Sequence, residues 1–113
     1  RVGELGRFDV VHLGLGADGH TASLFPGSPA LEADPGRLVA MNEDTSGRNP
    51  LTRMTLTLAG IARARTAIVT VMGEDKREAL ARVAAGDPEV PASHIRADRV
   101  VWLADRAAAG DLG

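Results

Sequence analysis

The segment Gly14–Gly27, GLGADGHTASLFPG, contains the residues of this chain best suited to chemistry. Asp18 and His20 stand two positions apart in it, among three glycines. An imidazole can act as a general base near neutral pH, and a neighbouring carboxylate can orient it or stabilise its protonated form. We therefore predict that His20 activates a water molecule and that Asp18 supports it. The alternative for Asp18 is an Asx turn that caps the loop.

The glycines Gly14, Gly16 and Gly19 have the spacing of a dinucleotide-binding fingerprint, GxGxxG. That fingerprint needs a helix of about a dozen residues facing the pyrophosphate. Prolines follow the glycines too soon for such a helix, the first of them at Pro26. We therefore reject a bound NAD and predict that the glycines bring backbone N–H groups close to a substrate carbonyl oxygen as it gains charge. A plain glycine-rich turn around a packed or solvated histidine is the alternative.

Lys76 is the single lysine among 13 basic residues. It follows Gly73 in the first turn of a predicted helix, where unpaired backbone N–H groups favour anions. We predict that Lys76 binds a phosphate group and that Arg53 supplies a second contact. Both could instead be ordinary surface residues. His12, inside an apolar strand, is expected to be structural.

Short apolar runs alternate with helix-forming segments along the chain, which indicates an α/β fold with a doubly wound, mostly parallel, Rossmann-like sheet. Residues 8–15 form a nearly continuous apolar run, typical of a strand buried on both faces. Residues 20–25 could form one helical turn, and residues 43–52 form a polar surface loop. The predicted strands are 8–15, 38–41, 53–58, 67–72 and 99–103, and the predicted helices are 59–65, 74–85 and 105–109.

Composition excludes several classes of function. The 113 residues carry a formal charge of −2, include only 3% aromatics and contain no cysteine. No nucleic-acid partner is expected from such a surface, and no disulfide or thiolate site is possible. No apolar run approaches the ~20 residues of a membrane span, so we expect a cytoplasmic protein without a membrane partner. Neither HExxH nor GxSxG occurs, and we expect no metal, no cofactor and no covalent intermediate.

The segment Gly14–Gly27 closely resembles the central motif of 6-phosphogluconolactonases, within the glucosamine-6-phosphate isomerase/6-phosphogluconolactonase family. The run RMTLT from Arg53 resembles the family's Arg-Ile-Thr-Leu-Thr strand, and Gly73–Lys76 resembles its Gly-x-x-Lys turn. The resemblance implies a glucosamine-6-phosphate deaminase-like fold. It further implies that residues 1–113 are the C-terminal portion of a single 6-phosphogluconolactonase domain, with a sheet incomplete at its N-terminus.

The resemblance implies hydrolysis of 6-phospho-D-glucono-1,5-lactone to 6-phospho-D-gluconate in the oxidative pentose phosphate pathway, with His20 as the base. Two alternatives remain. Related deaminases continue their Gly-His with Ile-Ala-Phe-Asn-Glu-Pro, whereas residues 21–26 here read TASLFP, without a carboxylate. The other alternative is an inactive fragment that binds sugar phosphates. Residues 46–52 also depart from the family's Lys-Pro-Pro, and the oligomeric state is not predicted.

Overall fold

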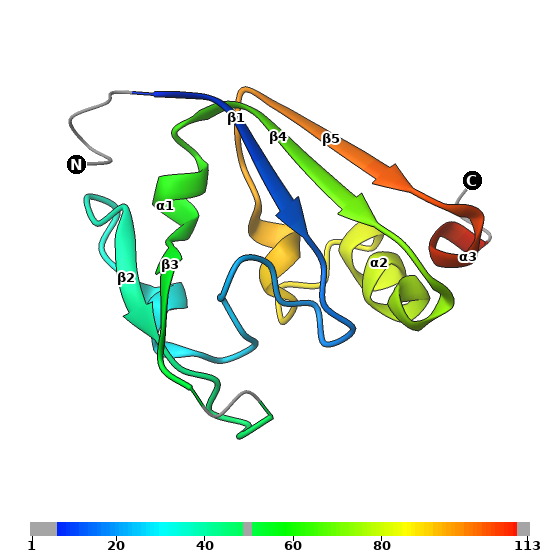
Figure 1. Ribbon diagram of the computed structural model, residues 1–113, viewed down its shortest axis with the longest axis horizontal. Helices are drawn as coiled ribbons and strands as arrows, with labels where there is room; N and C mark the ends of the chain where they lie inside the picture. The colour runs from blue at the N-terminus through cyan, green and yellow to red at the C-terminus, as the bar shows by residue number, and fades with distance from the viewer. Residues whose placement is uncertain (1–6, 49–50, 111–113) are drawn as a thin grey trace.

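The computed structural model describes residues 7–48 and 51–110. Its main sheet has three parallel strands, in the order β1 (Phe8–Gly14), β4 (Ala64–Val71) and β5 (Arg99–Ala104) (Figure 1). These strands correspond to the predicted strands 8–15, 67–72 and 99–103. Because neighbouring strands run in the same direction, all their carboxyl ends meet at one edge of the sheet, which confirms the predicted α/β class.

One face of this sheet forms the core. Val11, Leu13 and Val69 are buried on it and belong to a cluster that also contains Leu24 and Leu80. The opposite face is open in the described part of the chain, where Val10 is 56% and Leu103 is 53% exposed. Within the described part of the chain, no element covers the side of β1 that Val10 occupies. The prediction that strand 8–15 is buried on both faces is therefore wrong there.

The strands β2 (Val39–Asn42) and β3 (Arg53–Leu56) form a separate antiparallel hairpin instead of joining the parallel sheet. In Figure 1 the loop that follows β1 lies between this hairpin and the sheet. Helix α1 (Leu58–Ile61) begins at the cap Thr57, whose hydroxyl accepts the N–H of Gly60. The predicted helix 59–65 is shorter than expected, since β4 already begins at Ala64.

Beyond β4, the chain forms the 3-10 turn η3 (Glu74–Lys76) and then helix α2 (Arg77–Ala84), close to the predicted helix 74–85. The 3-10 helix η4 (Pro91–His94) and helix α3 (Arg106–Ala109) follow, and a further 3-10 helix, η2 (Pro29–Glu32), precedes the hairpin. None of the helices in the described ranges is long and apolar enough to cross a membrane.

The predicted helical turn over residues 20–25 is not formed. Thr21 and Leu24 instead pair in an isolated antiparallel bridge, closed by a hydrogen bond of 2.9 Å from the Leu24 N–H to the Thr21 carbonyl. Ala22, between them, has a φ of 50°, which is uncommon for a residue other than glycine and incompatible with a right-handed helix. The segment after His20 is therefore a tight reversal of the chain.

Candidate active site

The loop after β1 folds back on itself through short hydrogen bonds. The Gly16 N–H donates to the His20 carbonyl at 2.8 Å, and the Gly19 N–H donates to the Gly16 carbonyl at 2.9 Å. The Thr21 hydroxyl donates to the carbonyl of Gly14, the last residue of β1, at 2.9 Å. These contacts fix the loop to the carboxyl end of its strand, the edge at which open α/β sheets bind ligands.

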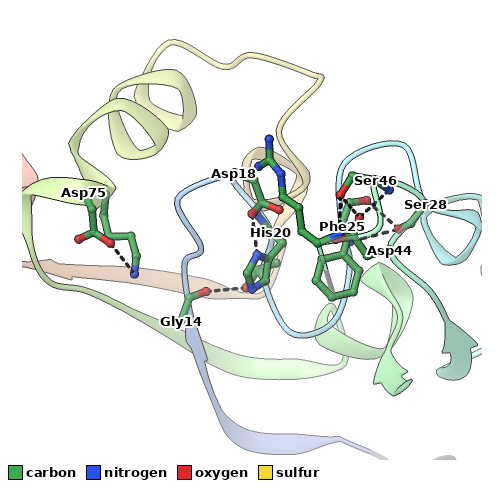
Figure 2. Close-up of polar contacts among 11 residues, drawn as sticks. Gly14, Asp18, His20, Phe25, Ser28, Asp44, Ser46 and Asp75 are labelled. Carbon is green, nitrogen blue, oxygen red and sulfur yellow. Dashed lines mark hydrogen bonds and ion pairs between the residues drawn. The ribbon is translucent and has the colours of Figure 1, made fainter. Parts of the chain in front are cut away.

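Asp18 and His20 form a direct pair, shown in Figure 2. His20 Nδ1 lies 2.6 Å from Asp18 Oδ1, and the same oxygen accepts the backbone N–H of His20 at 3.0 Å. The carboxylate therefore makes both predicted contacts, an Asx turn and a hydrogen bond with the imidazole. Since a carboxylate only accepts hydrogen bonds, Nδ1 carries the proton in this contact, and Nε2 of a neutral ring is left as the basic nitrogen.

Gly16 lets the His20 ring lie directly on the loop backbone. A Cβ atom at this position would stand 2.1 Å from His20 Cε1 and Nδ1 and 2.9 Å from Asp18 Oδ1. Phe25 holds the ring from another side, with the two ring centroids 5.0 Å apart and their planes at 48°. The imidazole is thus confined by Asp18, by Gly16 and by an aromatic ring that is itself only 1% exposed.

A cavity of about 510 Å³ opens beside His20. The wall includes residues from β1, from the loop, from the hairpin and from the start of α2: Val11, His12, Leu13, Gly14, Leu15, Gly16, His20, Ala22, Leu56 and Lys76. It therefore brings together three of the predicted site positions from the loop, Gly14, Gly16 and His20, with the predicted phosphate-binding lysine.

Lys76 reaches this cavity from the turn between β4 and α2. The turn depends on Gly73, which has a φ of 100° and whose N–H lies 3.2 Å from each carboxylate oxygen of Asp105. Asp105 also accepts the Ala108 N–H at 2.9 Å and caps α3. The ammonium of Lys76 makes a long ion pair of 3.9 Å with Asp75, and its side chain is 25% exposed.

Two predicted substrate-binding residues do not line this cavity. Gly19 has a φ of 90°, and a Cβ there would stand 2.5 Å from Val90 Cγ1, so this glycine allows close packing of the loop against residue 90. Arg53 is exposed on β3, in register with Asn42. The N–H groups of Gly16 and Gly19 both donate hydrogen bonds to carbonyl groups within the loop.

His12, expected to be structural, does line the cavity. It is exposed, and its Nε2 lies 2.6 Å from Thr70 Oγ1 on the neighbouring strand. The hydrogen bond is available because His12 and Thr70 share the open face of the sheet, which the apolar sequence around His12 did not reveal.

The polar loop before β3 borders a second cavity, of about 480 Å³, which Asp18 also lines. The turn in this loop is closed by Asp44, whose Oδ1 accepts hydrogen bonds from the Ser46 N–H at 3.0 Å and from the Ser46 hydroxyl at 2.7 Å (Figure 2). Arg48 also lines this second cavity. The part of the predicted loop at residues 49–50 lies outside the described residues. Nowhere in the described ranges do three or more His, Cys, Asp or Glu side chains gather as a metal site would require.

The chain thus combines a parallel α/β sheet, a carboxylate–imidazole pair at the carboxyl edge of that sheet, and a lysine that lines the same cavity as the imidazole. The family model of glucosamine-6-phosphate isomerases/6-phosphogluconolactonase matches residues 1–102. The chain belongs to this family, as the sequence motifs predicted.

The relatives support this assignment by sequence and by fold. A 6-phosphogluconolactonase from Synechocystis sp. is 39% identical over 114 residues, which span 97% of this chain and 45% of the relative. The solved structure of a 6-phosphogluconolactonase from Trypanosoma brucei is 37% identical with a TM-score of 0.78, covering 99% of this chain and 46% of that one. A monomeric glucosamine-6-phosphate deaminase shares the fold, with a TM-score of 0.71 at 22% identity, covering 96% of this chain and 50% of that one. The chain thus spans about half the length of these relatives or less.

Proposed function

We propose that this chain carries the catalytic base and the phosphate-binding lysine of a 6-phosphogluconolactonase, which hydrolyses 6-phospho-D-glucono-1,5-lactone to 6-phospho-D-gluconate. The observation that carries the proposal is the Asp18–His20 pair, 2.6 Å apart, with His20 on the wall of a cavity that Lys76 also lines. The names of the Synechocystis and Trypanosoma brucei relatives support the choice of substrate.

The chemistry needs one base. A δ-lactone is an activated ester, and water deprotonated by His20 Nε2 can add to its carbonyl carbon. The protonated ring is stabilised by the carboxylate of Asp18, in the manner of the carboxylate of a catalytic triad. The tetrahedral intermediate then collapses with cleavage of the bond between the carbonyl carbon and the ring oxygen. The proton held on Nε2 passes to that oxygen, which gives the open-chain acid.

Lys76 is the cation that we assign to the substrate phosphate. It lines the cavity at the start of α2, where backbone N–H groups also favour an anion. We retain Arg53 as a candidate for a second phosphate contact, although it lies away from the cavity wall. The glycines Gly14 and Gly16 lie on the wall, where the substrate would contact the loop.

The test compares two substrates. The chain, and the same chain joined to the part of the Synechocystis relative that it does not match, are assayed with freshly made 6-phosphogluconolactone and with glucosamine 6-phosphate. Lactone hydrolysis above the spontaneous rate, without ammonia release from the amino sugar, is the expected result. Ammonia release would instead assign the site to a deaminase. Binding of 6-phosphogluconate without turnover of either substrate would leave only a sugar-phosphate-binding protein.

A further inference from the structure

A buried polar cluster connects the β2–β3 hairpin to the loop that carries His20. Asn42, the last residue of β2, is 3% exposed, and both the nitrogen and the oxygen of its side-chain amide form hydrogen bonds. Its Nδ2 donates to the Ser23 carbonyl at 2.7 Å and to the Ser28 hydroxyl at 2.9 Å, and its Oδ1 accepts the Ala30 N–H at 3.0 Å. Since only this orientation of the amide satisfies all three partners, the network itself assigns the nitrogen and the oxygen.

Ser28, which binds Asn42, also forms hydrogen bonds with the backbone of Phe25. The Ser28 hydroxyl donates to the Phe25 carbonyl at 2.7 Å and accepts the Phe25 N–H at 3.1 Å, so both backbone groups of Phe25 are held by one buried side chain. The Phe25 ring then lies 5.0 Å from the His20 ring. Three residues therefore link the end of β2 to the imidazole.

The hairpin also holds the loop through its other strand. Thr55 on β3 is 5% exposed, and its hydroxyl accepts the Ser23 N–H at 3.0 Å. Ser23 is therefore fixed at both backbone groups, its N–H by Thr55 and its carbonyl by Asn42. The residues Met41 and Met54 on the opposite face of the hairpin are 59% and 71% exposed, so the buried face is the one that contacts the loop.

We infer that Asn42 is a positioning residue for the reaction, acting on His20 through Ser28 and Phe25, with Thr55 as its weaker partner. The inference rests on the proposed function, because it assigns a purpose to the rigidity of the His20 loop. Neither Asn42 nor Phe25 lines the cavity, so the network acts on the orientation of the base and leaves the binding of substrate to other residues. Asn42 holds the loop through Ser23 and Ser28 and holds η2 through Ala30, and these contacts would keep the imidazole in the orientation that general-base catalysis requires.

The test uses Asn42→Leu, which removes all three hydrogen bonds, and Thr55→Val, which removes one. Met41→Leu is the matched control on the same strand, because its side chain is exposed on the opposite face. Asn42→Leu should lower kcat by about 10- to 100-fold, as small misplacements of a catalytic group do, while KM stays within about twofold. Thr55→Val should lower kcat by about two- to tenfold, and Met41→Leu should change neither constant.

The variants are made in whichever form of the protein hydrolyses the lactone, or in the 113-residue chain if none does. Activity is measured well below the melting temperature of each variant. The NMR signals of the His20 ring are recorded in parallel. The ring current of Phe25 shifts these signals, and they do not depend on turnover. They should move in Asn42→Leu and in Thr55→Val but not in Met41→Leu.

A lower Tm with unchanged kcat and unchanged His20 signals would overturn the inference and leave Asn42 a stabiliser of the fold. If Asn42→Leu does not fold, the milder Thr55→Val decides by the same two measurements. Absence of lactone turnover in the unmodified protein would contradict the proposed function alone, since the His20 signals still report whether the hairpin positions the ring.

Discussion

His20 and Lys76, which line the same cavity, are held by different kinds of contact. His20 is held by the Asp18 carboxylate at 2.6 Å, by close contact with Gly16 and by the buried ring of Phe25. Lys76 makes a longer ion pair, of 3.9 Å, with Asp75, whose own side chain is 71% exposed. A group that moves a proton must be oriented within a fraction of an ångström, whereas a flexible ammonium can follow a phosphate as a point charge. The comparison predicts that changes near His20 lower kcat and that changes near Lys76 raise KM.

The largest effect is expected for His20→Gln in an active form of the protein. Loss of the general base should lower kcat by about 10²- to 10⁴-fold, with little change in KM, because the base acts in the chemical step. Steady-state hydrolysis of the lactone, corrected for the spontaneous rate, measures both constants. An unchanged kcat would remove His20 from the mechanism.

Gly16→Ala should have the next largest effect. The new Cβ would stand 2.1 Å from the His20 ring, so the ring must move, and kcat should fall by about 10- to 100-fold. Gly36→Ala is the matched control, because a Cβ there meets no atom within 4 Å. Equal kinetics for the two variants would show that the loop can yield without disturbing the base.

Lys76→Ala should affect binding more than chemistry. Loss of one charge-assisted contact to a phosphate costs ~1–3 kcal/mol, which raises KM by about 5- to 150-fold, while kcat changes little. Asp75→Asn is the control: it removes the long ion pair and leaves the ammonium available, so KM should not rise. If Lys76→Ala leaves KM unchanged, the phosphate binds elsewhere, and Arg53 becomes the first residue to test.

The smallest effect, on thermal stability, is expected just after the C-terminal end of α2. The Glu89 backbone N–H, and then the Arg82 guanidinium, hold the pKa of the Asp87 carboxyl below its ordinary value of 3.8. A lowered pKa means that the contact stabilises the fold above pH 3.8 and loses this contribution as the pH falls through the lower folded value.

Thermal unfolding of the unmodified chain and of Asp87→Asn, measured between about pH 7 and pH 2, should show a gap in Tm that closes in acid. Glu89→Gln should show no gap, since its side chain is not the partner of Asp87. A gap that persists at low pH would show that the contact does not depend on the charge.

The sequence predicted the elements whose signals are local. The apolar strand before Gly73, the helix after it and the GLGADGH loop at the end of β1 all lie close to their predicted places. It also predicted the Asp18–His20 pair and the side of the sheet that carries it, because the carboxyl ends of parallel strands meet there.

The parts that the sequence did not predict depend on long-range contacts. The hairpin of β2 and β3 pairs residues 39–42 with 53–56 and leaves the main sheet, since its buried face contacts the His20 loop. Asn42 lies just after the predicted strand 38–41, and its inward-facing amide is evident only in the structure. The chain reverses at Thr21–Leu24, where a helical turn was predicted. The Thr21 hydroxyl donates a hydrogen bond to the Gly14 carbonyl and so ties this segment to the end of β1.

The most direct test of the Asp18–His20 pair is the rate of lactone ring opening by the chain joined to the unmatched part of the Synechocystis relative, compared with the same protein carrying Asp18→Asn. We expect hydrolysis well above the spontaneous rate in the first protein. In the second we expect a kcat lower by about tenfold or more at similar KM, because the amide no longer stabilises the protonated imidazole. Hydrolysis at the spontaneous rate in the first protein, or equal kcat in the two, would contradict it.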